Sequence, residues 1–329
     1  MTRALITGIA GFAGSHLAEH LLAEGDEVAG LVLDPAPSPN LAAIAGRVKL
    51  IPGDLTDPAA VAAALDHAAP DLVYHLAGFA SPRLSVADPL ACYRVNAMGT
   101  AVLLDAMRRS GARPRVLVVS SGEVYGRAGP GPIPETAPLR PMSPYGASKA
   151  AAEMIALAAF ASDGIPTIRA RSFNHTGPRQ EPVFAGPAFA RQIAEAEAGL
   201  RPRELRVGNL APVREMSNVR DVVRAYRLIL SRGTPGEAYN VASGLGTTIR
   251  GFLDRLLERA RVPLAVTEDP ALFRAAEIDS LVGDPARLIA ATGFRPTTPI
   301  SETAAAVLDD WRARTGPSAT GAAATSSLR

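Results

Sequence analysis

Short apolar runs alternate with amphipathic segments along the first half of the chain. Residues 4–7 and 28–33 are apolar and partly β-branched, whereas residues 12–23 repeat leucine at helical spacing. Such runs predict buried strands, and the helical spacing predicts helices. Strands are expected at 4–7, 28–33, 48–51, 72–76, 116–120 and 165–171, and helices at 12–23, 59–67, 90–107 and 145–160. This alternation is typical of an α/β protein whose helices cover both faces of a doubly wound parallel sheet.

The second half of the chain is less regular. Breaks rich in proline and glycine occur at 128–144, 177–187, 232–237 and 243–247, and helices are predicted between them at 188–198, 219–230, 249–259 and 300–314. We expect residues 1–172 to form mainly the sheet domain and residues 173–314 mainly a smaller, substrate-binding lobe that returns some strands and helices to the sheet. Residues 315–329 are poor in apolar side chains and are expected to form a disordered tail.

The composition fits a cytoplasmic protein with a large core. Of 329 residues, 47% are hydrophobic and 20% charged, and the net charge of +2 gives no case for binding nucleic acid. Neither a signal peptide nor a membrane span is expected, because no long apolar run occurs. A single cysteine, Cys92, excludes an internal disulfide and a cysteine metal cluster, and no metal site is predicted. Only Lys49 and Lys149 are lysines, so each lysine is unusually informative.

Three glycines lie between the first predicted strand and the first predicted helix. They are Gly8, Gly11 and Gly14, and Phe12 begins the helix. Glycines at such a turn let the backbone approach a pyrophosphate, and the helix N-terminus offers N–H groups to the anion. The triplet alone is also compatible with an ordinary turn, but its place after the first strand of an alternating pattern favours a Rossmann-type dinucleotide site.

Two further strand ends fit a dinucleotide. Asp54 and Leu55 follow the third strand, where an acid can accept a hydrogen bond from the adenine amino group. Leu76, Ala77 and Gly78 end the fourth strand, where small residues leave room for the cofactor. Ligands of open parallel sheets bind at the carboxyl ends of the strands, so these positions belong to one crevice.

The end of the second strand bears on the choice of cofactor. Asp34 stands there, and no arginine accompanies it. An acid at this position binds the ribose hydroxyls of NAD, whereas an arginine would accept the 2′-phosphate of NADP. NAD is therefore favoured over NADP, although Asp34 can instead cap the turn before Pro35.

A tyrosine and a lysine, Tyr145 and Lys149, lie four residues apart on a predicted helix and therefore share one face. The lysine charge is expected to lower the tyrosine pKa and to suit it for acid–base catalysis. Ser121, after the fifth strand, is the candidate donor to a substrate oxygen. Glu123 is a candidate base, a sugar contact or a turn residue. Asn96 can support the lysine through water or simply mark a helix kink.

Taken together, these motifs resemble the extended short-chain dehydrogenase/reductase family. Segments 139–145, 171–178, 207–210 and 274–278 are most similar to GDP-6-deoxy-4-keto-mannose reductases and GDP-mannose 4,6-dehydratases. The resemblance implies that Phe173 and Asn174 border the nicotinamide and the sugar. It further implies a substrate site containing Val207, with Arg179 and Arg214 on the diphosphate and Glu277 on the nucleoside.

The resemblance implies reduction of a GDP-linked 4-keto-6-deoxyhexose at C4. Three departures favour the reductases. Similar dehydratases usually carry threonine in place of Ser121, a polar or acidic residue in place of Gly122, and arginines near Leu33 and Asp34, where NADP is held. A 4,6-dehydratase or epimerase that recycles bound NAD, with Glu123 as base, stays open, as does a catalytically silent cofactor-binding regulator. The family often reads Arg-Asp-Phe where this chain has Arg-Glu-Met at 214–216, so the substrate loop is expected to differ. A homodimer is expected because helices 90–107 and 145–161 are apolar on more than one face.

Overall fold

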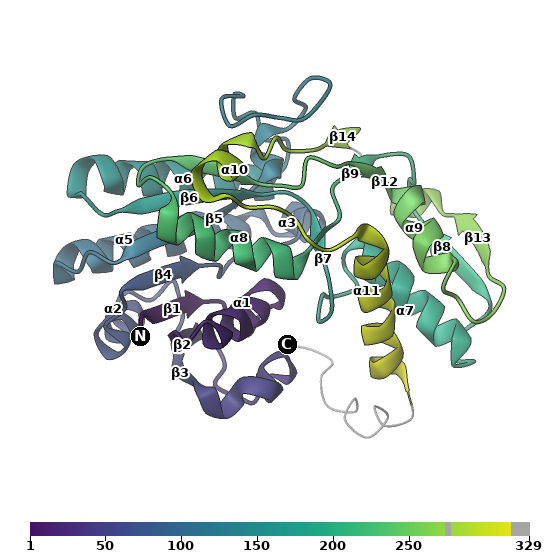
Figure 1. Cartoon of the computed structure of the whole chain (residues 1–329), viewed down its shortest axis with the longest axis horizontal. Helices are drawn as coiled ribbons and strands as arrows, with labels where there is room; N and C mark the ends of the chain where they lie inside the picture. Colours follow the sequence, from purple (N-terminus) through teal and green to yellow (C-terminus); the bar gives the residue numbers. More distant parts are fainter. Residues whose placement is uncertain (274–277, 317–329) are drawn as a thin grey trace.

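The computed structural model describes residues 1–273 and 278–316, and its largest element is a seven-stranded sheet (Figure 1). The strand order is β11-β6-β5-β4-β1-β2-β3, and every pair in this sheet is parallel. The strands are β1 (Arg3–Thr7), β2 (Glu27–Val32), β3 (Val48–Pro52), β4 (Leu72–His75), β5 (Arg115–Ser121), β6 (Thr167–Ser172) and β11 (Ala238–Val241). The predicted doubly wound parallel sheet is confirmed.

Helices cover both faces of the sheet, and each face has its own core (Figure 1). One face carries α1 (Phe12–Ala23), α8 (Val219–Arg232) and α10 (Ala286–Thr292). The other carries α2 (Pro58–Ala68), α5 (Gly99–Ser110) and α6 (Pro144–Asp163). The central strands are therefore buried on both sides, which explains their continuous apolar runs.

The helix predicted over residues 90–107 is divided. It consists of α4 (Pro89–Tyr93), a wide π-helical turn η2 (Arg94–Met98) and α5, and it is preceded by α3 (Pro82–Ala87). A π-helical turn adds a residue to the helical repeat and often occurs at a functional site. Here it contains Asn96, the residue for which a helix kink was the alternative to supporting the lysine.

Helix α6 has clear boundary signals. The Ser143 hydroxyl accepts a hydrogen bond from the Gly146 N–H at 3.0 Å, and Pro144 occupies the first helical position. Gly164 ends the helix with φ of 66°. These signals place Tyr145 in the first turn, beside the end of β5, and Lys149 one turn further along.

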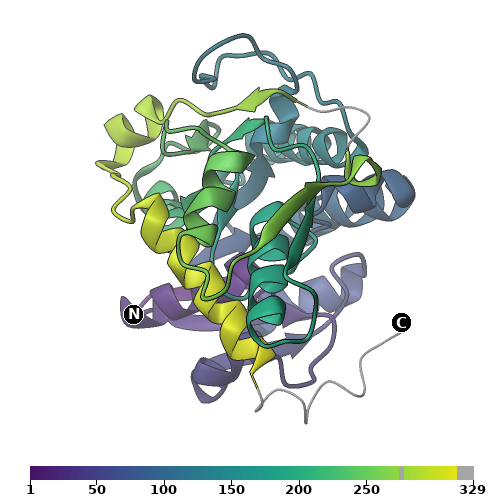
Figure 2. The same cartoon turned by 90° about the vertical axis from the view of Figure 1, so that its right-hand side faces the viewer.

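The second lobe packs α7 (Ala185–Glu197), α9 (Ile249–Leu257) and α11 (Ile300–Thr315) around its own apolar core. Figure 2 shows yellow α11 beside teal α7. The lobe's parallel pair is β8 (Glu204–Val207) with β13 (Ala265–Glu268). Shorter strands are β7 (His175–Thr176), β9 (Val213–Arg214), β10 (Ser217–Asn218), β12 (Thr247–Thr248) and β14 (Ser280–Leu281), and 3-10 turns are η1 (Pro39–Arg47), η3 (Gly122–Tyr125) and η4 (Pro270–Leu272).

Three elements from the second half of the chain belong to the main sheet domain: α8, β11 and α10. Strand β11 was not predicted, because its four residues include Asn240 and follow a turn rich in glycine and proline. Asn240 is buried, and its side-chain amide donates to the Ile133 carbonyl at 2.8 Å. Within the described part of the chain, no helix is long and apolar enough to cross a membrane.

Candidate active site

Tyr145, Lys149 and Ser121 meet where β5 ends and α6 begins. The Ser121 side chain acts on the Tyr145 phenol, whose pKa it lowers. The Lys149 ammonium donates to the Val119 carbonyl at 2.8 Å, and the residue is only 7% exposed. Tyr145, Lys149 and Ser121, three of the predicted catalytic residues, therefore share one site.

The pKa of Tyr145 differs from the expectation that Lys149 lowers it. Burial raises the pKa of the phenol to about 12, although the hydrogen bond with Ser121 opposes this shift. Burial also lowers the pKa of Lys149 to about 8. In this arrangement the Lys149 ammonium donates to a backbone carbonyl of β5 and not to the phenol. The phenol is therefore a proton donor at neutral pH.

Glu123 lies in the η3 turn, immediately after Ser121. Its backbone N–H donates to the Ser121 hydroxyl at 3.2 Å. The negative charge of Glu123 contributes to raising the pKa of Tyr145, after burial. A role of Glu123 as base or sugar contact stays a prediction.

The glycine loop has the close backbone contacts that a phosphate turn needs. Gly8 has φ of 76°, and a Cβ on it would lie 2.8 Å from Ala77 backbone atoms. A Cβ on Gly14 would lie 2.1 Å from the Gly8 carbonyl oxygen. Helix α1 starts after Gly11, and no side chain caps this end of the helix. The first N–H groups of α1 therefore face the glycine loop, where they can bind an anion. This cradle fits a dinucleotide pyrophosphate.

Segment 175–180 packs against the first half of α1. The Phe12 ring stacks on His175 with centroids 5.8 Å apart, and His16 Nε2 lies 3.0 Å from the Pro178 carbonyl. Arg179 forms an ion pair with Glu19, and its guanidinium also donates to Ser15 at 3.2 Å. Contact of Arg179 with a substrate diphosphate stays a prediction, and it would require exchange of the Glu19 partner.

A buried histidine that the sequence did not single out joins two strand ends. Ala77 N–H donates to the Thr7 hydroxyl at 3.1 Å, which lies 2.8 Å from His75 Nδ1. His75 Nε2 lies 2.9 Å from the Thr100 hydroxyl, which donates to the Asn96 carbonyl at 2.6 Å. Because Thr100 uses its only proton on that carbonyl, Nε2 must carry the ring proton. Burial lowers the pKa of His75 to about 3, so the ring stays neutral.

The side chain of Asn96 supports the loop beside Lys149. Its oxygen accepts from Phe79 N–H at 2.7 Å, and its amide donates to the Ser148 hydroxyl at 2.8 Å. A Cβ on Gly78 would lie 2.6 Å from Asn96 Oδ1 and 3.3 Å from Lys149 Nζ. Glycine at 78 therefore lets the fourth strand end approach both groups.

The predicted adenosine contacts lie in turns at the ends of β2 and β3. Asp34 is exposed, and one carboxylate oxygen accepts from Ala36 N–H at 2.8 Å, which is the turn-capping role left open above. Asp54 caps the next turn in the same way, accepting from Thr56 N–H at 2.8 Å. Leu55 is buried and packs where a Cβ on Gly99 would lie. Ligand contacts by Asp34 and Asp54 stay predictions, as do those of Leu55 and Leu76.

Phe173 is buried more deeply than its predicted place beside the nicotinamide and sugar requires. The ring is 2% exposed and stacks on Tyr125. Cβ atoms on Gly122 and Gly283 would lie 3.0 Å and 2.4 Å from the ring. The ring is therefore held in the core, and the residue can meet a ligand only through its backbone. The neighbouring Asn174 fits its predicted role better, because its side-chain oxygen is buried without a hydrogen-bond partner among the described residues.

The remaining predicted substrate residues lie in the second lobe. Arg214 in β9 is buried, and its guanidinium donates to the Val213 carbonyl at 2.9 Å. Glu215 replaces the family's aspartate; its carboxylate accepts from Ser243 N–H at 2.6 Å and from Gly283 N–H at 2.8 Å. Val207 is 1% exposed and packs in the core of the lobe, so a substrate contact through its side chain is wrong. Glu277 lies outside the described residues.

Comparison with known proteins gives consistent results. The family model described as GDP-mannose 4,6 dehydratase matches residues 5–307. GDP-6-deoxy-D-mannose reductase of Pseudomonas aeruginosa is 36% identical over 95% of this chain and 98% of its own length. RMD from Pseudomonas aeruginosa, solved with NADPH, superposes with a TM-score of 0.82 at 34% identity, over 95% and 100% of the chains. UDP-glucose 4-epimerase of Thermus thermophilus, solved with NAD, gives a TM-score of 0.85 at 34% identity, over 94% and 99% of the chains.

Proposed function

Because the chain belongs to the GDP-mannose 4,6 dehydratase family of NAD(P)-dependent enzymes, we propose that it reduces a GDP-linked 4-keto-6-deoxyhexose at C4. One structural observation carries this proposal: Tyr145, a buried phenol that keeps its proton at neutral pH, shares a site with Ser121 and Lys149 in a protein whose glycine loop fits a dinucleotide. The full-length similarity to the GDP-6-deoxy-D-mannose reductase of Pseudomonas aeruginosa supports GDP as the nucleotide and a 4-keto sugar as the substrate.

The proposed residue roles follow from their contacts. Bound NAD(P)H supplies the hydride. Ser121 and Tyr145 together donate hydrogen bonds to the carbonyl oxygen at C4, and Tyr145 transfers its proton to that oxygen. Lys149 is the nearby cation that favours the tyrosinate left behind. The unpaired Asn174 oxygen accepts a hydrogen bond from the bound ligand.

A second reaction, internal oxidation and return of the hydride as in a 4,6-dehydratase or an epimerase, is favoured by one observation. The charge of Glu123 acts on the Tyr145 pKa, and in this proposal its carboxylate accepts a proton from the sugar carbon next to the keto group. Such a reaction leaves the cofactor unchanged after each turnover. The two candidates therefore differ in their cofactor balance.

We expect the purified protein to oxidise one NAD(P)H for each GDP-4-keto-6-deoxyhexose that it consumes. The measurement is loss of nicotinamide absorbance together with chromatographic quantification of the sugar product. UDP- and dTDP-linked 4-keto sugars are the controls for the nucleotide. Conversion of the GDP-sugar without loss of absorbance would contradict the reductase proposal and support Glu123-dependent chemistry instead.

The cofactor is proposed to be NAD rather than NADP, with Asp34 on the ribose. Solved structures similar to this chain hold NADPH or NAD, so the family uses both. The proposal rests on the negative charge of Asp34, which would repel a 2′-phosphate. The same absorbance assay compares kcat/KM for NADH and NADPH. Equal or better use of NADPH would contradict the role given to Asp34.

We propose that the protein works in the cytoplasm as a homodimer formed through α4, η2 and α6. Leu90, Met98 and Met154 lie on these mutually packed elements and are exposed, which is unusual for large apolar side chains in a group. A second copy of the chain is the proposed occupant of this surface. Met98→Glu with Met154→Glu is expected to halve the mass measured by light scattering. Leu200→Glu, an exposed leucine elsewhere, is the control, and an unchanged mass in the double variant would contradict the dimer surface.

A further inference from the structure

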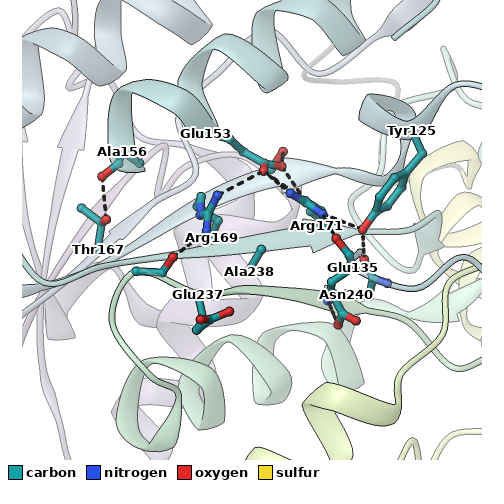
Figure 3. A network of polar contacts seen from close by, with 12 residues as sticks. Tyr125, Glu135, Glu153, Ala156, Thr167, Arg169, Arg171, Glu237, Ala238 and Asn240 are labelled. Atoms are coloured by element: carbon teal, nitrogen blue, oxygen red, sulfur yellow. Dashed lines mark hydrogen bonds and ion pairs between the residues drawn. The ribbon is translucent and has the colours of Figure 1, made fainter. Parts of the chain in front are cut away.

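Glu153 connects the helix that carries Tyr145 and Lys149 to two neighbouring strands. Glu153 lies on α6, one turn beyond Lys149, and is fully buried. Its Oε1 accepts from the Ser120 hydroxyl on β5 at 2.5 Å. Its Oε2 accepts from the Arg171 guanidinium on β6 at 2.8 Å, a contact shown in Figure 3. One side chain therefore links α6 to β5, which ends at Ser121, and to β6, which leads to Asn174.

Each link acts next to a residue of the proposed active site. Ser120 immediately precedes Ser121, and Arg171 lies three residues before Asn174. Arg171 also donates to the Tyr125 hydroxyl at 2.9 Å (Figure 3). Tyr125 stacks on Phe173. The Tyr125 hydroxyl in turn donates to Asn240 on β11 at 2.7 Å.

Stability alone does not explain this buried charge. A buried ion pair costs desolvation of both groups, and apolar replacement of both partners is often neutral or stabilising. Arg169 lies 4.0 Å from Glu153 as a second buried cation, so two arginines share this carboxylate. What the pair provides is fixed geometry, since Arg171 makes a forked contact with both carboxylate oxygens.

We propose that Glu153 is a positioning residue that sets Ser121 and Asn174 relative to Tyr145 and Lys149. The inference rests on the proposed function, because it assigns Glu153 an effect on that reaction's rate. It does not require Glu153 to touch substrate or cofactor. A misplacement of about 1 Å at a catalytic group can cost roughly 10²-fold in rate.

Two variants test this role. Ser120→Ala removes only the hydroxyl that donates to Glu153, and kcat is expected to fall about tenfold. Glu153→Gln combined with Arg171→Met removes both charges of the forked pair at similar volume, and kcat is expected to fall roughly 10²-fold. The Ser120 link does not involve Arg171 or Asn174, so KM is expected to change little in Ser120→Ala. The double variant also releases the segment that carries Asn174, so its KM for the sugar substrate is expected to rise.

The matched control is Glu197→Gln in the second lobe. Glu197 is also a buried carboxylate forked to an arginine, Arg312, at 2.7 and 2.8 Å, but the network drawn around Glu153 does not include it. This control is expected to lower the unfolding temperature and to leave kcat unchanged. If the role of Glu153 were purely structural, its variants would also show a lower unfolding temperature with unchanged kcat.

Hydrogen exchange of the segments 115–125 and 167–176 provides a readout that needs no turnover. Faster exchange there in both test variants, with unchanged exchange in the second lobe, is expected. If the parent protein is active and Ser120→Ala keeps both its kcat and its exchange rates, the positioning role of Glu153 is overturned. The proposed function is not affected by that result. A parent that consumes no NAD(P)H with any nucleotide sugar would instead overturn the proposed function, and the exchange data would still decide the positioning role.

Discussion

Tyr145→Phe is expected to lower kcat for NAD(P)H-dependent reduction by about 10²- to 10⁴-fold, the usual contribution of a positioned general acid. The substitution removes only the hydroxyl, which is the proposed proton donor and the group whose pKa Ser121 lowers. Cofactor affinity, measured by fluorescence titration, is expected to stay the same, because phenylalanine keeps the ring in place.

Tyr74→Phe is the matched control. Tyr74 is also a buried tyrosine, and its hydroxyl has no partner among the described residues, so its removal should leave kcat unchanged. Unchanged turnover in Tyr145→Phe would contradict the mechanism.

The pH profile of the parent separates the roles of the two catalytic groups. Burial raises the pKa of Tyr145 to about 12 and lowers that of Lys149 to about 8. The rate of reduction is therefore expected to fall as the pH rises past about 8, where Lys149 loses its charge while the phenol keeps its proton. A rate that stays constant well above the pKa of Lys149 would contradict the role of this residue.

Gly14→Ala is expected to weaken NADH binding roughly tenfold to a hundredfold, since overpacking of about 1–3 kcal/mol corresponds to that change in Kd. The added methyl group would lie 2.1 Å from the Gly8 carbonyl oxygen and 2.9 Å from the Ile9 Cα. Both neighbours are backbone atoms, so the loop itself must open. The Kd is measured by NADH fluorescence, together with the unfolding temperature.

Gly46→Ala is the control for glycine substitution. Gly46 lies in η1, and a Cβ on it would meet no atom within 4 Å. Neither NADH binding nor stability is expected to fall. If Gly14→Ala bound NADH as tightly as the parent, the loop would not be the pyrophosphate site.

The sequence predicted those features that depend on local pattern. Alternating apolar runs led to the sheet and its covering helices, and the spacing of Tyr145 and Lys149 led to one helix face. The burial of individual charged side chains could not be predicted from such local patterns. Glu153 and Arg171 look like ordinary charged residues in the sequence, and only the pairing of β5 with β6 under α6 brings them together. Arg179 was predicted to bind the substrate diphosphate because of its position in the sequence. In the structure it forms an ion pair with Glu19.

The place of β11 has a consequence for how the chain acquires its structure. The outermost strand beside β6 is contributed from residues 238–241, after much of the second lobe has already been made. On the ribosome, β6 must therefore wait for a neighbour that emerges roughly 70 residues later, which is several seconds at ordinary rates of translation. During that interval β6 is an open edge with unpaired N–H and C=O groups, the kind of edge that pairs with other chains. A shortened chain that ends before β11 would keep that edge permanently, so aggregation rather than an isolated cofactor domain is the expected product.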